Sequence, residues 1–243
     1  MTLRVLGSSS KGNCYIFDNS REALIVEAGV NFKEVKKALG FNLGKVAGCL
    51  VTHRHNDHAG YVQQIVESGI TTLALEDVWT AKGVRDTRAI AITLGKGYKV
   101  GNFKVLPFNA CHDVPCVGYL IEHPETGRIL FLTDSFMCEY TFPGLSQILI
   151  ECNYSDYALT QAIIEGRTAK SQRERLMTSH LELETCKGIL LANDLSQVEN
   201  VVLIHLSGNN ADEKHFVSEI QGVCGKCVYA AHPGLTIEMN KLC

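Results

Sequence analysis

Apolar residues occur along the chain in short runs and in alternation with polar residues, and both patterns indicate β-strands. In the first part of the chain the expected strands are Leu3–Leu6, Cys14–Phe17, Ala23–Val26, Val46–Thr52 and Thr71–Leu75. Further along, the expected strands are Ala89–Thr93, Lys99–Val100, Phe103–Phe108, Val117–Glu122, Arg128–Leu132, Gln147–Glu151, Val201–Ile204, Lys226–Tyr229 and Leu235–Glu238.

Helical patterns separate many of these strands. Asn31 is a suitable N-cap for a helix that reaches about Leu39 and stops at Gly40. The other expected helices are Tyr61–Glu67, Asp77–Lys82, Tyr157–Glu165, Arg167–Met177, Glu182–Asn193 and Asp212–Gly222. The elements fall into two comparable halves with no linker between them. This order predicts one α/β (α+β) domain over residues 1–243, with two sheets packed face to face and helices outside.

Composition narrows the class of protein. The 243 residues are 46% apolar, which is enough for a substantial core. The formal net charge of −3 means that binding of a polyanion would depend on a local basic patch. No apolar run approaches the roughly 20 residues that cross a bilayer, and no signal peptide is visible. The ten cysteines are scattered, which is typical of reduced thiols, so we expect a soluble cytoplasmic protein with no membrane contact.

The most informative segment is a histidine cluster directly after the expected strand Val46–Thr52. It reads His53-Arg54-His55-Asn56-Asp57-His58, so three of the nine histidines fall within six residues. Imidazole and carboxylate groups are good ligands for a borderline metal such as zinc. His53 and His55 can reach one ion, and Asp57 and His58 can reach a second ion a few ångströms away. A surface cluster that binds metal adventitiously is the alternative.

Three further ligand-type residues follow expected strands. His112 comes after Phe103–Phe108, Asp134 after the strand that ends at Leu132, and His205 after Val201–Ile204. Each of them taken alone would more often be structural. Four strand ends that each deliver a ligand type favour a metal site.

The pattern His-x-His-x-Asp-His, followed by His, Asp and His at later strand ends, resembles the metallo-β-lactamase superfamily over nearly the whole chain. The resemblance implies a four-layer αββα sandwich with two divalent ions at one edge, Zn²⁺ first and Mn²⁺ as the alternative. It assigns the first ion to His53, His55 and His112, and the second to Asp57, His58 and His205. Asp134 would bridge the two ions.

One position departs from that family pattern. The family has an aspartate in an Asp-Ala-Gly setting after an early strand, and this chain has Glu27-Ala28-Gly29. By the resemblance, Glu27 would hydrogen-bond a metal ligand without touching metal. An ordinary glutamate at a strand end is the other interpretation.

Shorter motifs resemble the YycJ/WalJ-type exonucleases and the ribonuclease Z-like phosphodiesterases of this superfamily. They are the Gly7–Asn13 loop, Glu151-Cys152-Asn153-Tyr154, Ser179-His180-Leu181, His205-Leu206-Ser207 and the turn at 230–234. Tyr154 departs from the usual histidine. The resemblance makes His180 a proton donor to the leaving oxygen, and a helix-capping or solvent-exposed histidine is the alternative.

Candidate catalytic residues are therefore Asp57 and His180, and the substrate has its own candidates. The glycine- and serine-rich loop could present N–H groups to an anion, and the basic residues of 167–175 could bind phosphates or form a solvated helix face. The substrate-binding candidates are Ser9, Ser10, Asn13, Asn153 and Arg173.

These residues predict a metal-dependent hydrolase, first of all a phosphodiesterase or nuclease. It would cleave DNA or RNA with a hydroxide held by the two metals. A small-molecule hydrolase of cyclic nucleotides, thioesters or lactams is the second hypothesis, and net charge −3 mildly favours it. A binding module with a degenerate site is the third, and the complete ligand set argues against it. The oligomeric state stays open, a homodimer included.

Overall fold

The strands of the computed structural model, which describes residues 1–241, form two sheets of seven strands each. The first sheet has the order β14-β1-β2-β3-β4-β5-β6 and the second β13-β12-β11-β10-β9-β8-β7. Strands of the first sheet are β1 (Thr2–Gly7), β2 (Cys14–Asp18), β3 (Ala23–Val26), β4 (Val46–Leu50), β5 (Thr72–Ala74), β6 (Ala89–Ala91) and β14 (Thr236–Glu238). Strands of the second are β7 (Tyr98–Val100), β8 (Phe103–Ala110), β9 (Cys116–His123), β10 (Gly127–Leu132), β11 (Leu145–Glu151), β12 (Asn200–Ile204) and β13 (Cys227–Ala230).

Each sheet is antiparallel on one side and parallel on the other. In the first sheet β14, β1, β2 and β3 pair antiparallel, and β3 to β6 pair parallel. In the second sheet β7 to β10 pair antiparallel, and β10 to β13 pair parallel. Parallel neighbours need crossover connections, which are usually helices. The helices therefore gather over the parallel half of each sheet.

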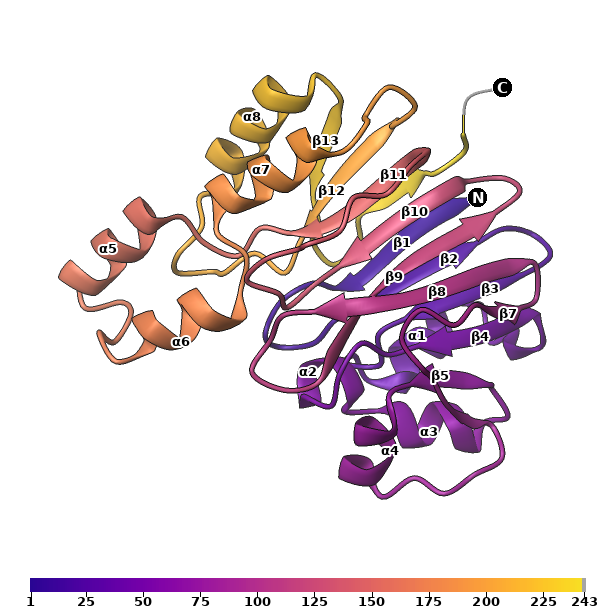
Figure 1. The fold of residues 1–243 in the computed structure, drawn as a ribbon. Helices are drawn as coiled ribbons and strands as arrows, with labels where there is room; N and C mark the ends of the chain where they lie inside the picture. Colours follow the sequence, from indigo (N-terminus) through magenta and orange to yellow (C-terminus); the bar gives the residue numbers. More distant parts are fainter. Residues whose placement is uncertain (242–243) are drawn as a thin grey trace.

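Those helices make the two outer layers (Figure 1). Over the first sheet lie α1 (Phe32–Ala38), α3 (Val62–Glu67) and α4 (Glu76–Lys82), and over the second lie α7 (Leu183–Ala192) and α8 (Glu213–Cys224). A separate apolar cluster fills the space between the sheets, where Tyr15 of β2 meets Phe131 of β10 edge to face at 5.3 Å. The αββα sandwich expected from the sequence is confirmed.

Several element boundaries differ from the expected ones. Asp57 and His58 lie in a short helix, α2 (Asn56–Ala59), instead of a loop. The helix expected at Arg167–Met177 is α6 (Gln172–Ser179), because the preceding helix α5 (Asp156–Ile164) closes with Gly166 in a left-handed conformation and a turn follows. A short 3₁₀ helix, Leu43–Lys45, precedes β4. Figure 1 shows α5 and α6 projecting from the sandwich.

The parallel strands decide where the chemistry can lie. β3 and β4 of one sheet, and β10, β11 and β12 of the other, end at the same edge of the sandwich. In sheets of this kind, ligands bind beyond the carboxyl ends of the strands. Within residues 1–241, no helix is both long enough and apolar enough to cross a membrane.

Candidate metal centre

Every candidate metal ligand lies at that edge. His53 and His55 follow β4, and Asp57 and His58 stand on α2 directly after them. The other three ligands follow strands of the second sheet, His112 after β8, Asp134 after β10 and His205 after β12. The centre is therefore built across the interface between the two sheets.

The backbone at three of these strand ends is left-handed. Four non-glycine residues of the described chain have a positive φ, and three of them are Glu27 (72°), Asp134 (48°) and His205 (54°). This conformation is uncommon for residues with a Cβ and concentrates at functional sites. It turns each side chain off the strand direction and into the centre.

Four side chains form the first ligand group: His53, His55, His112 and Asp134. His53 Nε2 lies 3.1 Å from His55 Nδ1 and 3.4 Å from Asp134 Oδ2. His112 Nε2 lies 3.3 Å from His55 Nδ1 and 3.8 Å from Asp134 Oδ2. The two imidazoles after β4 thus present different ring nitrogens to one point.

The second group consists of Asp57, His58, Asp134 and His205. His58 Nε2 lies 3.0 Å from Asp134 Oδ2 and 3.5 Å from Asp57 Oδ2. His205 Nε2 is also 3.5 Å from Asp57 Oδ2. Asp134 Oδ2 belongs to both groups, so one carboxylate oxygen is placed to join two ions.

These distances fit a pair of divalent ions. Tetrahedral zinc with bonds of about 2.0–2.1 Å sets its ligand atoms about 3.4 Å apart, and the distances above scatter around that value. The other ring nitrogens mostly face oxygen acceptors. His53 Nδ1 lies 3.0 Å from Thr52 Oγ1, and His112 Nδ1 lies 2.8 Å from the Ser179 carbonyl oxygen. Such partners fix the tautomer of a metal-binding histidine.

Glu27 lies beside His58 Nδ1, the ring nitrogen that does not face the second ligand group. Its carboxylate is fully buried, Oε1 lies 3.2 Å from His58 Nδ1, and it accepts a hydrogen bond from Thr52 Oγ1 at 2.6 Å. The hydrogen-bond angle at His58 Nδ1 is poor, which leaves that nitrogen without a well-formed partner. Glu27 lies outside every candidate ligand group of the described chain.

His180 forms a third candidate ligand group with Asp134, His205 and Glu151, a residue that the sequence did not single out. Glu151, fully buried at the end of β11, accepts from His180 Nδ1 at 2.7 Å and from the Leu181 amide at 3.2 Å. The His180 ring stacks on His205 with centroids 5.4 Å apart. Glu151 stands in the segment that resembles the nuclease motif, directly after an apolar run, and that signal could have found it.

Burial and the neighbouring charges shift the titration of these groups. Burial lowers the pKa of His53 well below its usual value, so this imidazole is neutral and free to bind metal. Burial disfavours charge on Asp134 too, but the surrounding imidazoles of His205 and His58 hold the pKa of its carboxyl well below the usual range. For His180, the effect of burial is outweighed by the Glu151 carboxylate, which raises the imidazole pKa.

Hollows on the surface open onto the centre. One of about 330 Å³ is lined by ligands from both groups together with Ser10, Arg175 and His180. A neighbouring hollow of about 540 Å³ also borders His180 and is lined by Ser9, Asn153 and Ser207, among others. Ser10 lines both, so the glycine- and serine-rich loop stands over the metal centre.

Two of the five expected substrate contacts have a different place. Asn13 is fully buried, and its Nδ2 lies 3.1 Å from His58 Nε2 and 3.2 Å from the Asp57 carbonyl oxygen. Arg173 is directed away from the hollow and bonds Asp156 and Thr160. The basic residue of α6 that does line the hollow is Arg175, two positions further along.

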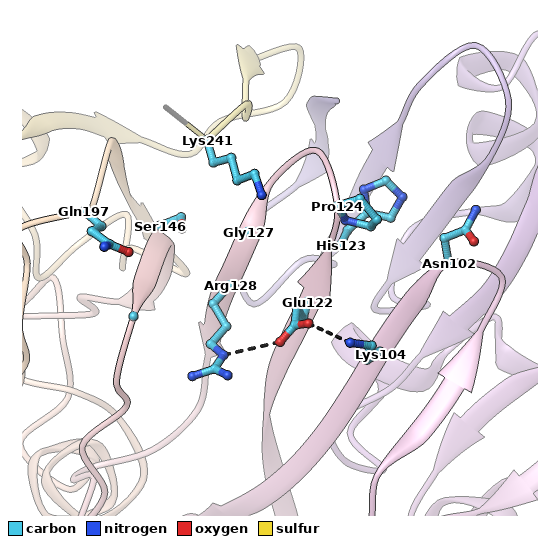
Figure 2. A pocket seen from close by; sticks show the side chains of 11 residues that line it. Asn102, Lys104, Glu122, His123, Pro124, Gly127, Arg128, Ser146, Gln197 and Lys241 are labelled. Carbon is cyan, nitrogen blue, oxygen red and sulfur yellow. Dashed lines mark hydrogen bonds and ion pairs between the residues drawn. The ribbon is translucent and has the colours of Figure 1, made fainter. Parts of the chain in front are cut away.

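Another hollow, of about 440 Å³, lies at the opposite ends of the strands (Figure 2). Lys104, Arg128 and Lys241 line it. Glu122 stands between the first two and pairs with Lys104 at 2.9 Å and with Arg128 at 3.5 Å, as the dashed lines in Figure 2 show. Glu122 therefore offsets one of the three positive charges that line this hollow.

Comparison with known proteins agrees with the architecture. The chain is 23% identical over 223 residues to the exodeoxyribonuclease WalJ of Streptococcus pneumoniae, covering 85% of this chain and 81% of that protein. Zn²⁺-bound PqqB from Methylobacterium extorquens superposes with a TM-score of 0.72 at 15% identity, covering 98% of this chain and all of that one. A diphosphatase of the PhnP family gives a TM-score of 0.69 at 15% identity, covering 100% of this chain and 98% of that one.

The sequence pattern of the metallo-beta-lactamase superfamily matches residues 9–133, which contain five of the seven ligand candidates and end directly before a sixth, Asp134. Together with the paired ligand groups at the carboxyl ends of the strands, this match shows that the chain belongs to the metallo-beta-lactamase superfamily.

Proposed function

We propose that the protein is a metal-dependent phosphodiesterase that cleaves phosphodiester bonds in DNA or RNA. The observation that carries the proposal is the pair of ligand groups sharing Asp134 Oδ2, with the His180–Glu151 pair beside the second group. Bound there, two divalent ions would lower the pKa of water and clamp the phosphoryl oxygens. Zinc is our first choice because the donor set is imidazole and carboxylate, and manganese is second.

The chain's own residues would protonate the leaving oxygen. An alkoxide leaves a phosphodiester slowly unless it is protonated, and histidine is the natural donor near neutral pH. His180 Nδ1 is engaged by Glu151, so Nε2 is the nitrogen left to give a proton. The Glu151 carboxylate raises the pKa of His180 and so keeps that proton available. Asp57 and Asp134 would hold the metals in place for the attack.

The nucleic-acid substrate is supported by two observations. The relative WalJ is named as an exodeoxyribonuclease. The hollow over the candidate metal centre also shares Ser10, His180 and His205 with a second hollow, which gives a leaving strand room to lie. We assign the leaving group to that second hollow, since His180 borders both.

A panel of substrates tests the proposal. Purified protein with Zn²⁺ or Mn²⁺ should hydrolyse bis-p-nitrophenyl phosphate and at least one of linear DNA, nicked DNA and RNA. Cyclic nucleotides, a thioester and a β-lactam should be poor substrates. Turnover of the small substrates without cleavage of any polynucleotide would replace the nuclease by a small-molecule hydrolase.

We further propose that residues 1–243 act as a single domain in the cytoplasm. In support, the nine cysteines within the described part of the chain are all unpaired, and besides the inter-sheet core an apolar cluster lies between each sheet and the helices that cover it. Thiol titration of the denatured protein without reductant should find every cysteine as a free thiol. Stable disulfides in freshly isolated protein would contradict the assignment of compartment.

A further inference from the structure

We propose that Arg175 binds the phosphate group of the substrate at the mouth of the metal centre, exchanging its ion pair with Asp113 for the phosphate oxygens. The proposal rests on the phosphodiesterase function and identifies the side chain that recognises the anion.

The electrostatics of the centre call for a cation at this place. The carboxylates gathered there are those of Asp57, Asp134, Glu27 and Glu151. Two divalent ions would bring four positive charges, and a protonated His180 would bring a fifth. The four carboxylates and Asp113 at the rim offset these five charges, so the loaded centre would be close to neutral. A phosphodiester anion therefore needs a further positive group.

Arg175 is the arginine placed to meet that need. It lines the 330 Å³ hollow beside metal ligands and His180. Its only ion pair in the described chain joins Nη2 to Asp113 Oδ2 at 3.8 Å, and 72% of its side chain is exposed. A long pair in solvent contributes little and breaks easily. The planar guanidinium can instead bind two phosphate oxygens at once.

Arg173 on the same helix provides the contrast. Two residues along an α-helix differ in direction by about 200°, so Arg173 and Arg175 point to opposite sides of α6. Arg173 Nη2 is 3.1 Å from Asp156, and Nη1 is 3.1 Å from Thr160 Oγ1. Arg173 therefore interacts with residues of α5 and does not line the hollow.

The position of Arg175 on α6 also ties anion recognition to proton donation. His180 caps the C-terminal end of the same helix, and the Ser179 carbonyl oxygen accepts from the metal-ligand candidate His112. Arg175, which would bind the phosphate, and His180, which would donate the proton, are thus presented by the same helix. Asp113 lies 3.5 Å from His55 Nε2, so the pair with Arg175 joins α6 to the first ligand group as well.

Isothermal titration of metal-loaded protein with inorganic phosphate tests the proposal without relying on turnover. Arg175→Ala should weaken phosphate binding about tenfold, as expected for loss of a charge-assisted contact. Arg175→Lys keeps the positive charge but loses the planar guanidinium, so its affinity for phosphate should lie between those of the wild type and Arg175→Ala. Arg173→Ala removes the same charge from the other side of α6 and should weaken binding by less than twofold. Metal analysis should find both ions in every variant.

Three results would overturn the proposal: wild-type affinity in metal-replete Arg175→Ala, an equal loss in Arg173→Ala, or no phosphate binding by the wild type. The KM for bis-p-nitrophenyl phosphate separates this failure from that of the proposed function. Hydrolysis of diesters with an unchanged KM in Arg175→Ala removes only the role of Arg175. Arg175-dependent phosphate binding without hydrolysis of any diester removes only the phosphodiesterase.

Discussion

At the scale of single residues, the metal centre depends on backbone that most side chains avoid. Glu27, Asp134 and His205 all have a positive φ, a conformation that costs of order 1–3 kcal/mol where it is not relieved. The residue directly before each of them is fully buried, and the packing of the two sheets holds the backbone in this conformation. This local cost in conformational free energy lets the three side chains point into the metal centre.

His180 should matter for proton transfer and not for metal binding. His180→Ala should lower kcat on a natural diester by about 10²–10⁴-fold, the usual contribution of general acid catalysis, while both metals stay bound. The loss should shrink with p-nitrophenolate as leaving group, which hardly needs a proton. His215→Ala on the exposed face of α8 is the control. Loss of metal from His180→Ala would make His180 a ligand and contradict this role.

Glu27 should act through His58. Glu27→Gln should leave the fold intact and reduce metal affinity or activity about 10–100-fold, because the carboxylate orients the imidazole. Glu22→Gln is a matched control, since Glu22 faces His123 at a similar 3.1 Å at a different place in the fold. Metal affinity by competition with a chelating dye measures both variants. Equal affinities for Glu27→Gln and wild type would remove Glu27 from the metal centre.

At the scale of elements, strands were easier to place from the sequence than the helix around Arg173. Buried strands such as β11 and β12 each contain a continuous apolar run, 148–150 and 201–204, and a polar residue follows each run directly. The segment 167–179 is polar except for Ala169, Leu176 and Met177, so neither the start of its helix nor the rotational phase shows clearly in the pattern. A shift in the start of that helix turns Arg173 out of the hollow and brings in Arg175.

The contact between the loop after β3 and α2 provides a prediction at this scale. A Cβ on Gly29 would lie 1.7 Å from the Asp57 carbonyl oxygen, so Gly29→Ala must displace α2. We expect a loss of about 1–3 kcal/mol in the free energy of unfolding and weaker binding of the second ion. Gly97→Ala, where no atom lies within 4 Å, should change neither.

Chemical denaturation and metal analysis measure both variants. Retention of two tightly bound ions by Gly29→Ala would show that α2 is not fixed by this contact.

At the scale of the whole molecule, the sequence predicted the sandwich and the ligand types better than their mutual geometry. Seven ligand candidates could be named because each follows a strand or stands in the histidine cluster. Three features of the centre depend on how the chain folds and leave no local signal. Asp134 Oδ2 faces both of the first two ligand groups, Glu151 supports His180, and Asn13 is buried against His58 Nε2. Such contacts join distant residues and leave no local pattern.

Removing the metals should loosen the junction between the sheets. The ligand groups draw on both sheets, so the ions bind the folded state and stabilise it by mass action, by about 4 kcal/mol at a thousandfold excess over Kd. For a chain of this size, a chelator should then lower Tm by roughly 10 °C. Purified protein should contain close to two equivalents of metal. An unchanged Tm on complete removal would mean that the sheets do not depend on the ions.

The spacing of the ligands along the chain has a consequence for biosynthesis. His53 and His205 are separated by about 150 residues, which takes the ribosome roughly 8–30 s to translate. A nascent chain can gather His53, His55, His112 and Asp134 first, and it lacks the last ligand of the second group until β12 has emerged. A growing or prematurely terminated chain therefore stays incomplete and inert beside its own messenger RNA.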